Sequence, residues 1–283
     1  MDNLLDRFTP KIGFMQGRLV KKYNSRYQAF PPNTWKKEFE IARELQLAMI
    51  EFIADFENED ENPFFSSKKE LDCLSDLASK NNLEVVSICA DYFMKYKLIN
   101  SNTFALNDAS LDALKVLLAN GKFYGIKNIV LPFVDESSLS SIFREQKVSD
   151  SLKRIIDFFE KVEIECSLEL DLHPDEILEL FYSFNSDFVK INYDIGNSAA
   201  LGFDCEEELN KYGHLINDIH LKDRILRGGP VIFGTGSANF DPLFDFIHKN
   251  KFSGPIIMQS YRDEEGLEIF KKQLNWVKER YLL

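Results

Sequence analysis

The sequence of 283 residues has few of the features that mark secreted or membrane-bound proteins. Its four cysteines, Cys73, Cys89, Cys166 and Cys205, lie far apart and form no Cys-x-x-Cys pair. We therefore expect reduced thiols in a cytoplasmic protein rather than a disulfide framework. No apolar run approaches the roughly 18 residues of a membrane span, and the N-terminal Met1–Asp6 has early acids instead of an apolar leader.

Basic residues are also in short supply. Lysine and arginine total 34 against 46 aspartates and glutamates, which gives a net charge of −12 with histidine neutral. Proteins that bind nucleic acids gain much of their affinity by neutralising phosphates with lysine and arginine. The composition therefore argues against a nucleic-acid partner, and the chain offers no segment for membrane binding. Hydrophobic residues make up 45% of the chain, which is enough to build a large core.

The hydrophobic pattern alternates between short apolar runs and amphipathic segments along the whole chain. Eight such pairs are separated by no linker-like break, so we predict a single domain over residues 1–283. Strands that are joined by helices must run parallel, and eight units in this length are typical of a (β/α)8 TIM barrel of the α/β class. An open doubly wound sheet is the alternative, but no G-x-G-x-x-G follows the first strand. The expected strands are 11–15, 49–53, 83–89, 128–133, 166–170, 189–194, 216–221 and 255–259.

Polar side chains recur where these strands end, which is the end of such a barrel that carries chemistry. Four of them, Glu169, Asp194, His220 and Gln259, follow one another at about one strand–helix unit each. Carboxylates in apolar strands are costly unless they are paired, hydrogen-bonded or bound to a cation. Two carboxylates, an imidazole and an amide oxygen are ligands that suit Mn²⁺, Mg²⁺ or Co²⁺. The alternative is a set of unrelated polar groups that bond to loops at the barrel rim.

The order of these motifs resembles the xylose isomerase-like TIM barrels, a superfamily of sugar and sugar-phosphate isomerases and epimerases with AP-endonuclease branches. The resemblance extends from Ile12 to about Trp276, and no single motif carries it. Its landmarks are Ile12-Gly13-Phe14-Met15-Gln16-Gly17-Arg18-Leu19, Ile50-Glu51-Phe52-Ile53, Leu168-Glu169, Tyr193-Asp194-Ile195-Gly196-Asn197, Ile219-His220-Leu221-Lys222-Asp223 and Gly234-Thr235-Gly236.

The resemblance implies one divalent metal ion, held by Glu, Asp, His and Glu from the last four strands. Glu169, Asp194 and His220 match this pattern, whereas Gln259 stands where the family usually has Glu. Glutamine can still offer its carbonyl oxygen to a metal, but it cannot take a proton from carbon. The departure weakens the two-base mechanism of the family's ketose epimerases. Mn²⁺ is the metal we favour, with Mg²⁺, Co²⁺ or Zn²⁺ as alternatives.

The predicted function is therefore a metal-dependent sugar or sugar-phosphate isomerase or epimerase that acts through a metal-stabilised enediolate, with Glu169 as the base. Gln259 favours an isomerase or a lyase over a two-base epimerase. The sequence is compatible with a homo-oligomer but does not fix the oligomeric state. The alternatives are a non-catalytic sugar-binding barrel and, with less support, an AP-endonuclease-like phosphodiesterase. The substrate-binding candidates are strand-end polar residues, among them cations suited to an anionic group. They are Gln16, Arg18, Glu51, Asp91, Asn197, Lys222, Asp223, Arg224 and Arg262.

Overall fold

The computed structural model of the protein describes residues 8–282 and contains a closed barrel of eight parallel strands. The N-terminal Met1–Asp6, whose composition argued against a leader, lies outside this range. The strands are short and almost wholly buried. They are β1 (Gly13–Met15), β2 (Met49–Ile53), β3 (Glu84–Cys89), β4 (Asn128–Phe133), β5 (Glu165–Leu170), β6 (Val189–Asp194), β7 (Ile216–Leu221) and β8 (Ile256–Met258).

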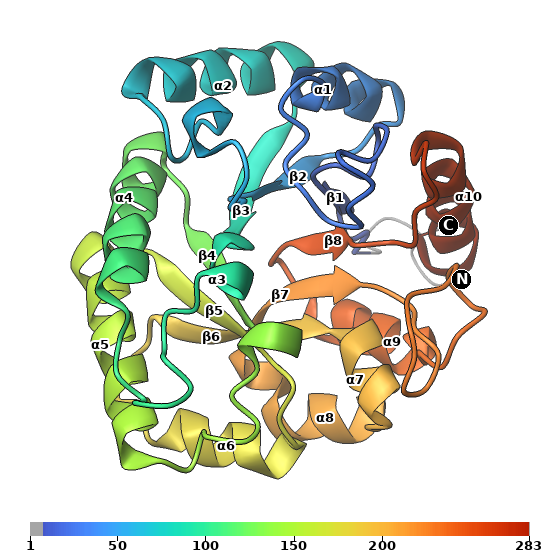
Figure 1. Ribbon diagram of the computed structural model, residues 1–283. Coiled ribbons are helices and arrows are strands. Elements are labelled where there is room, and N and C mark those ends of the chain that lie inside the picture. The colour runs from blue at the N-terminus through green and yellow to red at the C-terminus, as the bar shows by residue number, and fades with distance from the viewer. Residues whose placement is uncertain (1–7, 283) are drawn as a thin grey trace.

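Helices follow the strands and form a ring around the barrel (Figure 1). Short 3₁₀ turns, η1 (Glu59–Glu61), η2 (Asp135–Ser137) and η3 (Gly213–Leu215), connect some of these elements, and a π-helical turn, η4 (Lys278–Leu282), ends the described chain. The α-helices are α1 (Trp35–Glu44), α2 (Lys68–Asn81), α3 (Tyr92–Lys95), α4 (Asp108–Tyr124), α5 (Gln146–Val162), α6 (Pro174–Tyr182), α7 (Ile195–Leu201), α8 (Cys205–Tyr212), α9 (Phe240–Asn250) and α10 (Leu267–Val277).

The barrel closes because β1 pairs with both of its neighbours. Gly13 aligns with Met49 of β2 and with Ile257 of β8, and both pairings are parallel. This closure confirms the predicted TIM barrel and excludes the open sheet. A side chain at Gly13 would collide with the side chains of Met49 and Ile257 on either side, so glycine is required at this point of closure.

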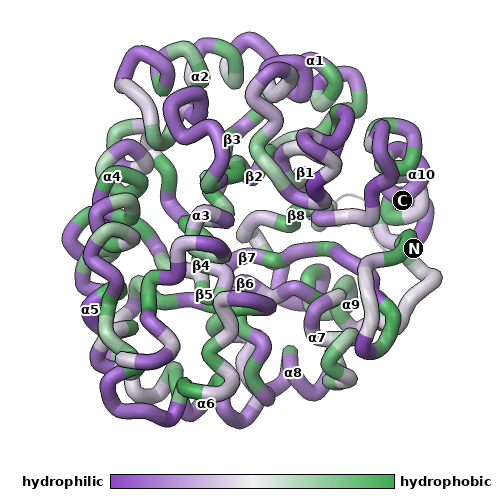
Figure 2. The backbone as a smooth tube through the Cα atoms, viewed as in Figure 1, coloured by the Kyte–Doolittle hydropathy of each residue, from purple (hydrophilic) through white to green (hydrophobic). Residues whose placement is uncertain are grey.

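The outer helices are amphipathic, as their alternating colours show in Figure 2. Their apolar faces pack on the strands, and one dense part of this core is aromatic. The ring of Phe52 on β2 lies 5.7 Å from Trp35 of α1, 5.3 Å from Phe64 and 5.8 Å from Phe30. Edge-to-face contacts of this kind stabilise the helix–strand interface beyond the area they bury. Within residues 8–282, no helix is both long and apolar enough to cross a membrane.

The structure also contains two helices that the sequence pattern did not predict. Both lie at the mouth of the barrel, where α3 follows β3 and α7 follows β6 without a long connection. Asp194 ends β6 and at the same time caps α7, because its carboxylate accepts a hydrogen bond of 2.8 Å from the backbone N–H of Asn197. Asn197 therefore lies in the first turn of a helix. This short helix turns the chain sharply at the strand end and brings Asn197 close to Asp194.

Candidate active site

The structure brings together three of the four predicted metal ligands at the carboxyl ends of β5, β6 and β7. A ligating atom from each of Glu169, Asp194 and His220 lies within 4.8 Å of the others, and all three residues are buried. Gln259 follows β8 directly and is buried as well, with its amide nitrogen donating to Gln28 Oε1 at 2.9 Å. The four side chains thus lie at the carboxyl ends of four consecutive strands, as the spacing of these residues in the sequence predicted.

Asn197 and Lys222 fix the two carboxylates of this cluster. The Asn197 amide donates to Glu169 Oε1 at 2.6 Å, and the Lys222 ammonium donates to Asp194 Oδ2 at 3.1 Å. Burial and the neighbouring Asp194 carboxylate raise the pKa of Glu169 to about 7. Burial alone would lower the pKa of His220, but the Glu51 carboxylate outweighs it and the pKa rises to about 10. The cluster is therefore a buried set of interacting charges, as active sites commonly are.

The residues of this cluster fit a divalent metal ion. His220 Nδ1 and Gln259 Oε1 are buried, and neither has a hydrogen-bond partner among the described residues. Such unpaired polar atoms are costly in a protein interior unless another group satisfies them. Two carboxylates and an imidazole, with an amide oxygen at the end of the next strand, form a donor set that suits Mn²⁺, Mg²⁺, Co²⁺ or Zn²⁺. The two unpaired atoms are therefore candidate metal-binding atoms.

Glu51, predicted as a substrate-binding residue, points across the barrel to His220 instead of toward the solvent. Its Oε1 lies 2.8 Å from His220 Nε2, and its Oε2 accepts a hydrogen bond of 2.5 Å from Ser87 Oγ. The side chains of Glu51 and His220 are fully buried. Both oxygens of the carboxylate are thus occupied by the protein itself.

The two predicted cations, Arg18 and Arg262, are buried. Their guanidinium groups donate hydrogen bonds mainly to backbone carbonyls. Arg18 donates to the carbonyls of Ser260 and Tyr27 and to Gln28 Oε1, at 2.9–3.2 Å. Arg262 donates to the carbonyls of Gly17 and Val20 at 2.5 and 2.7 Å. These bonds tie the segment after β1 to the segment after β8. A direct role of either arginine in substrate binding remains a prediction.

The remaining substrate-binding candidates divide into structural and accessible groups. Gln16 accepts from the backbone N–H of Ile53, and Asp223 accepts from the N–H groups of Gly234, Gly236 and Ala238. Asp223 thereby shapes the glycine-containing loop after β7. Arg224 is half-buried and donates to Asn197 Oδ1 at 2.7 Å, which leaves part of its guanidinium open at the mouth.

Asp91 faces Gln28 and Cys89, which bond to it at 3.0 and 3.1 Å. Burial raises the pKa of Asp91 to about 6, with a further contribution from Asp55. Sequence reasoning missed Gln28, which lies in the loop after β1 and connects Arg18, Asp91 and Gln259. A loop glutamine carries no periodic signal, so only the folded chain shows this bridging position.

Sequence reasoning also missed Glu38, which supports the backbone beside the site. It lies on α1, fully buried, and its Oε1 accepts from the N–H groups of Gly17 and Leu19 at 2.8 and 3.1 Å. Burial raises the pKa of this carboxyl to about 7, although both backbone bonds and two nearby arginines oppose the shift. Glu38 therefore holds the turn that carries Arg18, and it does so at an electrostatic cost.

Because burial raises the pKa of Glu38, we expect the free energy of unfolding to depend on pH. A carboxyl group with a raised pKa binds a proton in the folded state before it does so in the unfolded state. The contribution of Glu38 to the stability of the folded state is therefore fully present below pH 4.5, and it is lost as the pH rises through about 7. Glu38→Gln keeps the acceptor oxygen but does not titrate. Between pH 4.5 and 8, the unfolding free energy of the wild type should fall by about 3 kcal/mol more than that of the variant, measured by urea denaturation. Equal pH dependence in the two proteins would contradict this prediction.

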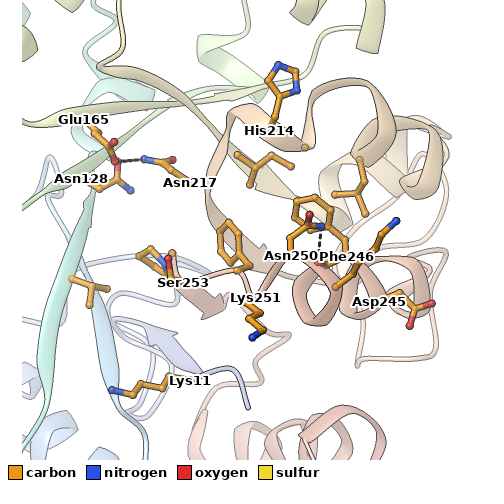
Figure 3. A pocket seen from close by; sticks show the side chains of 18 of the residues that line it. Lys11, Asn128, Glu165, His214, Asn217, Asp245, Phe246, Asn250, Lys251 and Ser253 are labelled. Carbon is orange, nitrogen blue, oxygen red and sulfur yellow. Dashed lines mark hydrogen bonds between the residues drawn. The ribbon is translucent and has the colours of Figure 1, made fainter. Parts of the chain in front are cut away.

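A wide, open cavity of about 1060 Å³ lies at the other end of the barrel (Figure 3). Its lining includes the first residues of several strands, such as Asn128, Glu165 and Asn217, with lysines and acids around the rim. Figure 3 shows Asn217 bonded to Glu165, a contact of 2.8 Å. Residues at this end of a TIM barrel contribute to stability rather than to chemistry. The Glu169–Asp194–His220 cluster at the opposite end is therefore the candidate active site.

Comparisons with known proteins agree with this architecture. L-ribulose-5-phosphate 3-epimerase UlaE of Escherichia coli O1:K1 / APEC is 21% identical over 261 residues, covering 87% of this chain and 89% of the relative. Inosose dehydratase of Clostridium botulinum (strain Alaska E43 / Type E3) is 25% identical over 127 residues, or 38% of this chain and 43% of the relative. The crystal structure of an IolI protein with a bound zinc atom has the same fold, with a TM-score of 0.70, 18% identity and coverage of 96% and 99%.

The family model agrees over most of the chain. It is described as a xylose isomerase-like TIM barrel and matches residues 39–280, which include seven of the eight strands and all four candidate metal ligands. The protein belongs to the xylose isomerase-like TIM barrel family.

Proposed function

We propose that the protein is a divalent-metal-dependent enzyme that moves a proton next to the carbonyl group of a ketose or ketose phosphate. The chain is an enzyme of the isomerase or epimerase type, as is UlaE, to which it is similar over most of its length. The observation that carries the metal-dependent proposal is the buried cluster of Glu169, Asp194 and His220, together with the unpaired oxygen of Gln259. A divalent ion held by these residues would polarise the carbonyl and acidify the adjacent C–H bond.

Glu169 is the base in this proposal. Burial and the Asp194 carboxylate raise the pKa of Glu169 to about 7, and a cation held beside it would lower that pKa and keep the carboxylate ionised, ready to accept a proton. Asn197 holds one carboxylate oxygen by a bond of 2.6 Å, which fixes the direction in which the other oxygen points. The Asp194 carboxylate, whose Oδ2 lies 3.1 Å from the Lys222 ammonium, would be the second anionic ligand of the cation.

Gln259 restricts the stereochemistry that this site performs. A neutral amide neither takes a proton from carbon nor delivers one to it. With Glu169 as the one base, the proton leaves and returns on the same face of the substrate. This arrangement suits an aldose–ketose isomerisation, or a dehydration in which a hydroxyl group leaves the neighbouring carbon. Epimerisation, the reaction in the name of UlaE, requires delivery from the opposite face.

Metal content is the measurement that tests the proposal. The wild type and a Glu169→Gln/His220→Ala double variant are purified without chelator and compared by elemental analysis. We expect about one Mn, Mg, Co or Zn per wild-type chain and loss of that metal in the variant. A wild type that has no metal and shows no thermal shift with millimolar Mn²⁺ would overturn the metal-dependent mechanism.

A panel of matched substrates then narrows the substrate class. Each ketose is tested with and without a terminal phosphate, in the presence of the metal found. A lower KM for the phosphorylated member would support an anion site, with the half-buried Arg224 as its first candidate. Equal KM values would assign the enzyme to neutral sugars.

A further inference from the structure

We propose that Glu51 is a positioning residue for the candidate metal ligand His220 and that it acts through the imidazole Nε2. The inference rests on the metal site proposed above and adds a residue from the opposite side of the barrel. β2, which carries Glu51, is separated from β7 by β8 and β1 in the closed sheet. The contact of 2.8 Å between Glu51 Oε1 and His220 Nε2 therefore spans the interior of the barrel.

The geometry assigns different tasks to the two imidazole nitrogens. Nε2 is bonded to Glu51, whereas Nδ1 is buried without a hydrogen-bond partner among residues 8–282. Nε2 must carry the proton of this bond, because a carboxylate oxygen only accepts. Nδ1 is then the nitrogen that a metal ion beside Glu169 and Asp194 would bind, with displacement of the proton that Nδ1 carries when the imidazole is charged. A carboxylate that holds the outer nitrogen of a metal-binding histidine fixes the ring's orientation and makes it a stronger ligand.

Glu51 is itself held in place for this role. Its second oxygen accepts a hydrogen bond of 2.5 Å from Ser87 Oγ on β3, and both side chains are fully buried. The carboxylate is thus fixed between β3 and β7. It has no access to solvent and no open oxygen, so substrate binding is the less suitable role for it.

A second metal ion between Glu51, Asp218 and His220 is the competing interpretation, because these residues also lie within 4.8 Å of one another. The surrounding hydrogen bonds argue against it. Asp218 Oδ1 accepts from Asn192 at 3.0 Å and Asp218 Oδ2 accepts from Asn128 at 2.8 Å. All four carboxylate oxygens of this group already have protein partners, and two amide groups direct hydrogen atoms toward it. Such a group needs no cation, so it acts as structural support beneath the metal site.

The test is a direct titration of metal binding by three variants. Glu51→Met keeps the volume but removes the acceptor, Glu51→Gln keeps an acceptor oxygen without the charge, and Glu208→Gln removes a different buried carboxylate. Glu208 accepts hydrogen bonds from Tyr193, Tyr212 and Ser198 and forms no hydrogen bond with His220 in the described part of the chain, so it is the matched control. Mn²⁺ affinity is measured by the electron paramagnetic resonance signal of the free ion. The absorption spectrum of bound Co²⁺ reports the ligand geometry.

We expect Glu51→Met to weaken Mn²⁺ binding about 10- to 100-fold and to change the Co²⁺ spectrum. Glu51→Gln should weaken binding less, by about three- to tenfold, and Glu208→Gln should bind as the wild type does. If Glu51→Met does not fold, Glu51→Gln decides, and wild-type affinity in that variant would overturn the inference. Wild-type affinity in a folded Glu51→Met would overturn it too. A wild type that binds neither metal would instead refute the proposed function itself.

Discussion

Replacing Glu169 by Gln is expected to lower kcat by about 10²- to 10⁴-fold, the usual contribution of a positioned general base. The substitution removes the basic oxygen but keeps the shape of the side chain. The retained amide oxygen can still accept the hydrogen bond from Asn197 that now measures 2.6 Å. The loss should therefore appear in kcat under metal saturation, measured with the substrate that the panel identifies.

The same experiment needs a control for the loss of a buried negative charge. Glu208→Gln supplies it, because Glu208 is also buried and lies in a separate network of tyrosine and serine hydroxyls. This variant should retain kcat within about twofold. A Glu169→Gln variant that binds metal and keeps more than a tenth of the wild-type kcat would show that another group abstracts the proton.

The barrel could be predicted from the sequence because its strands are short apolar runs with distinct ends. The strands at 49–53, 128–133, 189–194 and 216–221 match the structure at both ends. Helix α7 was missed because Ile195–Leu201 has only seven residues and follows strand β6 directly, so it shows no helical periodicity of its own. The capping bond from Asn197 to Asp194 that starts this helix depends on the folded turn and leaves no periodic pattern.

The candidate site was predictable in its residue types but not in its contacts. Strand-end position placed Glu169, Asp194 and His220 in one mouth, since parallel strands end at the same rim. The direction of a long side chain depends on its rotamer and on a partner far along the sequence. Glu51 therefore looked like a substrate ligand, although its partner is His220 across the barrel. Arg18 likewise appeared to be a free cation, although its donors are occupied by backbone carbonyls and Gln28.

Replacing Gln259 by Glu should have the second large effect, on metal affinity and on the stereochemistry of the product. An added carboxylate places a further negative charge beside a cation, and affinity at oxygen-rich sites rises with the number of charged ligands. We expect Mn²⁺ to bind about 100-fold more tightly, as measured by competition with a chelator. Because a carboxylate at this strand end can also exchange a proton with carbon, we expect the variant to form an epimer of the substrate.

The Gln259→Glu substitution should also lower the stability of the protein, because it disrupts the contacts of Gln259. Its amide nitrogen donates to Gln28 Oε1, which also accepts from Arg18. A carboxylate oxygen in its place would face an acceptor, so the variant should lose about 1–3 kcal/mol of stability. Gln259→Met is the matched control, because it removes the amide without adding charge and should weaken metal binding.

The one-base mechanism requires that the wild type form little epimer, which chiral analysis of the product in D₂O measures. A wild type that epimerises its substrate at full rate, with Gln259→Glu no faster, would show that the second proton comes from a group other than residue 259.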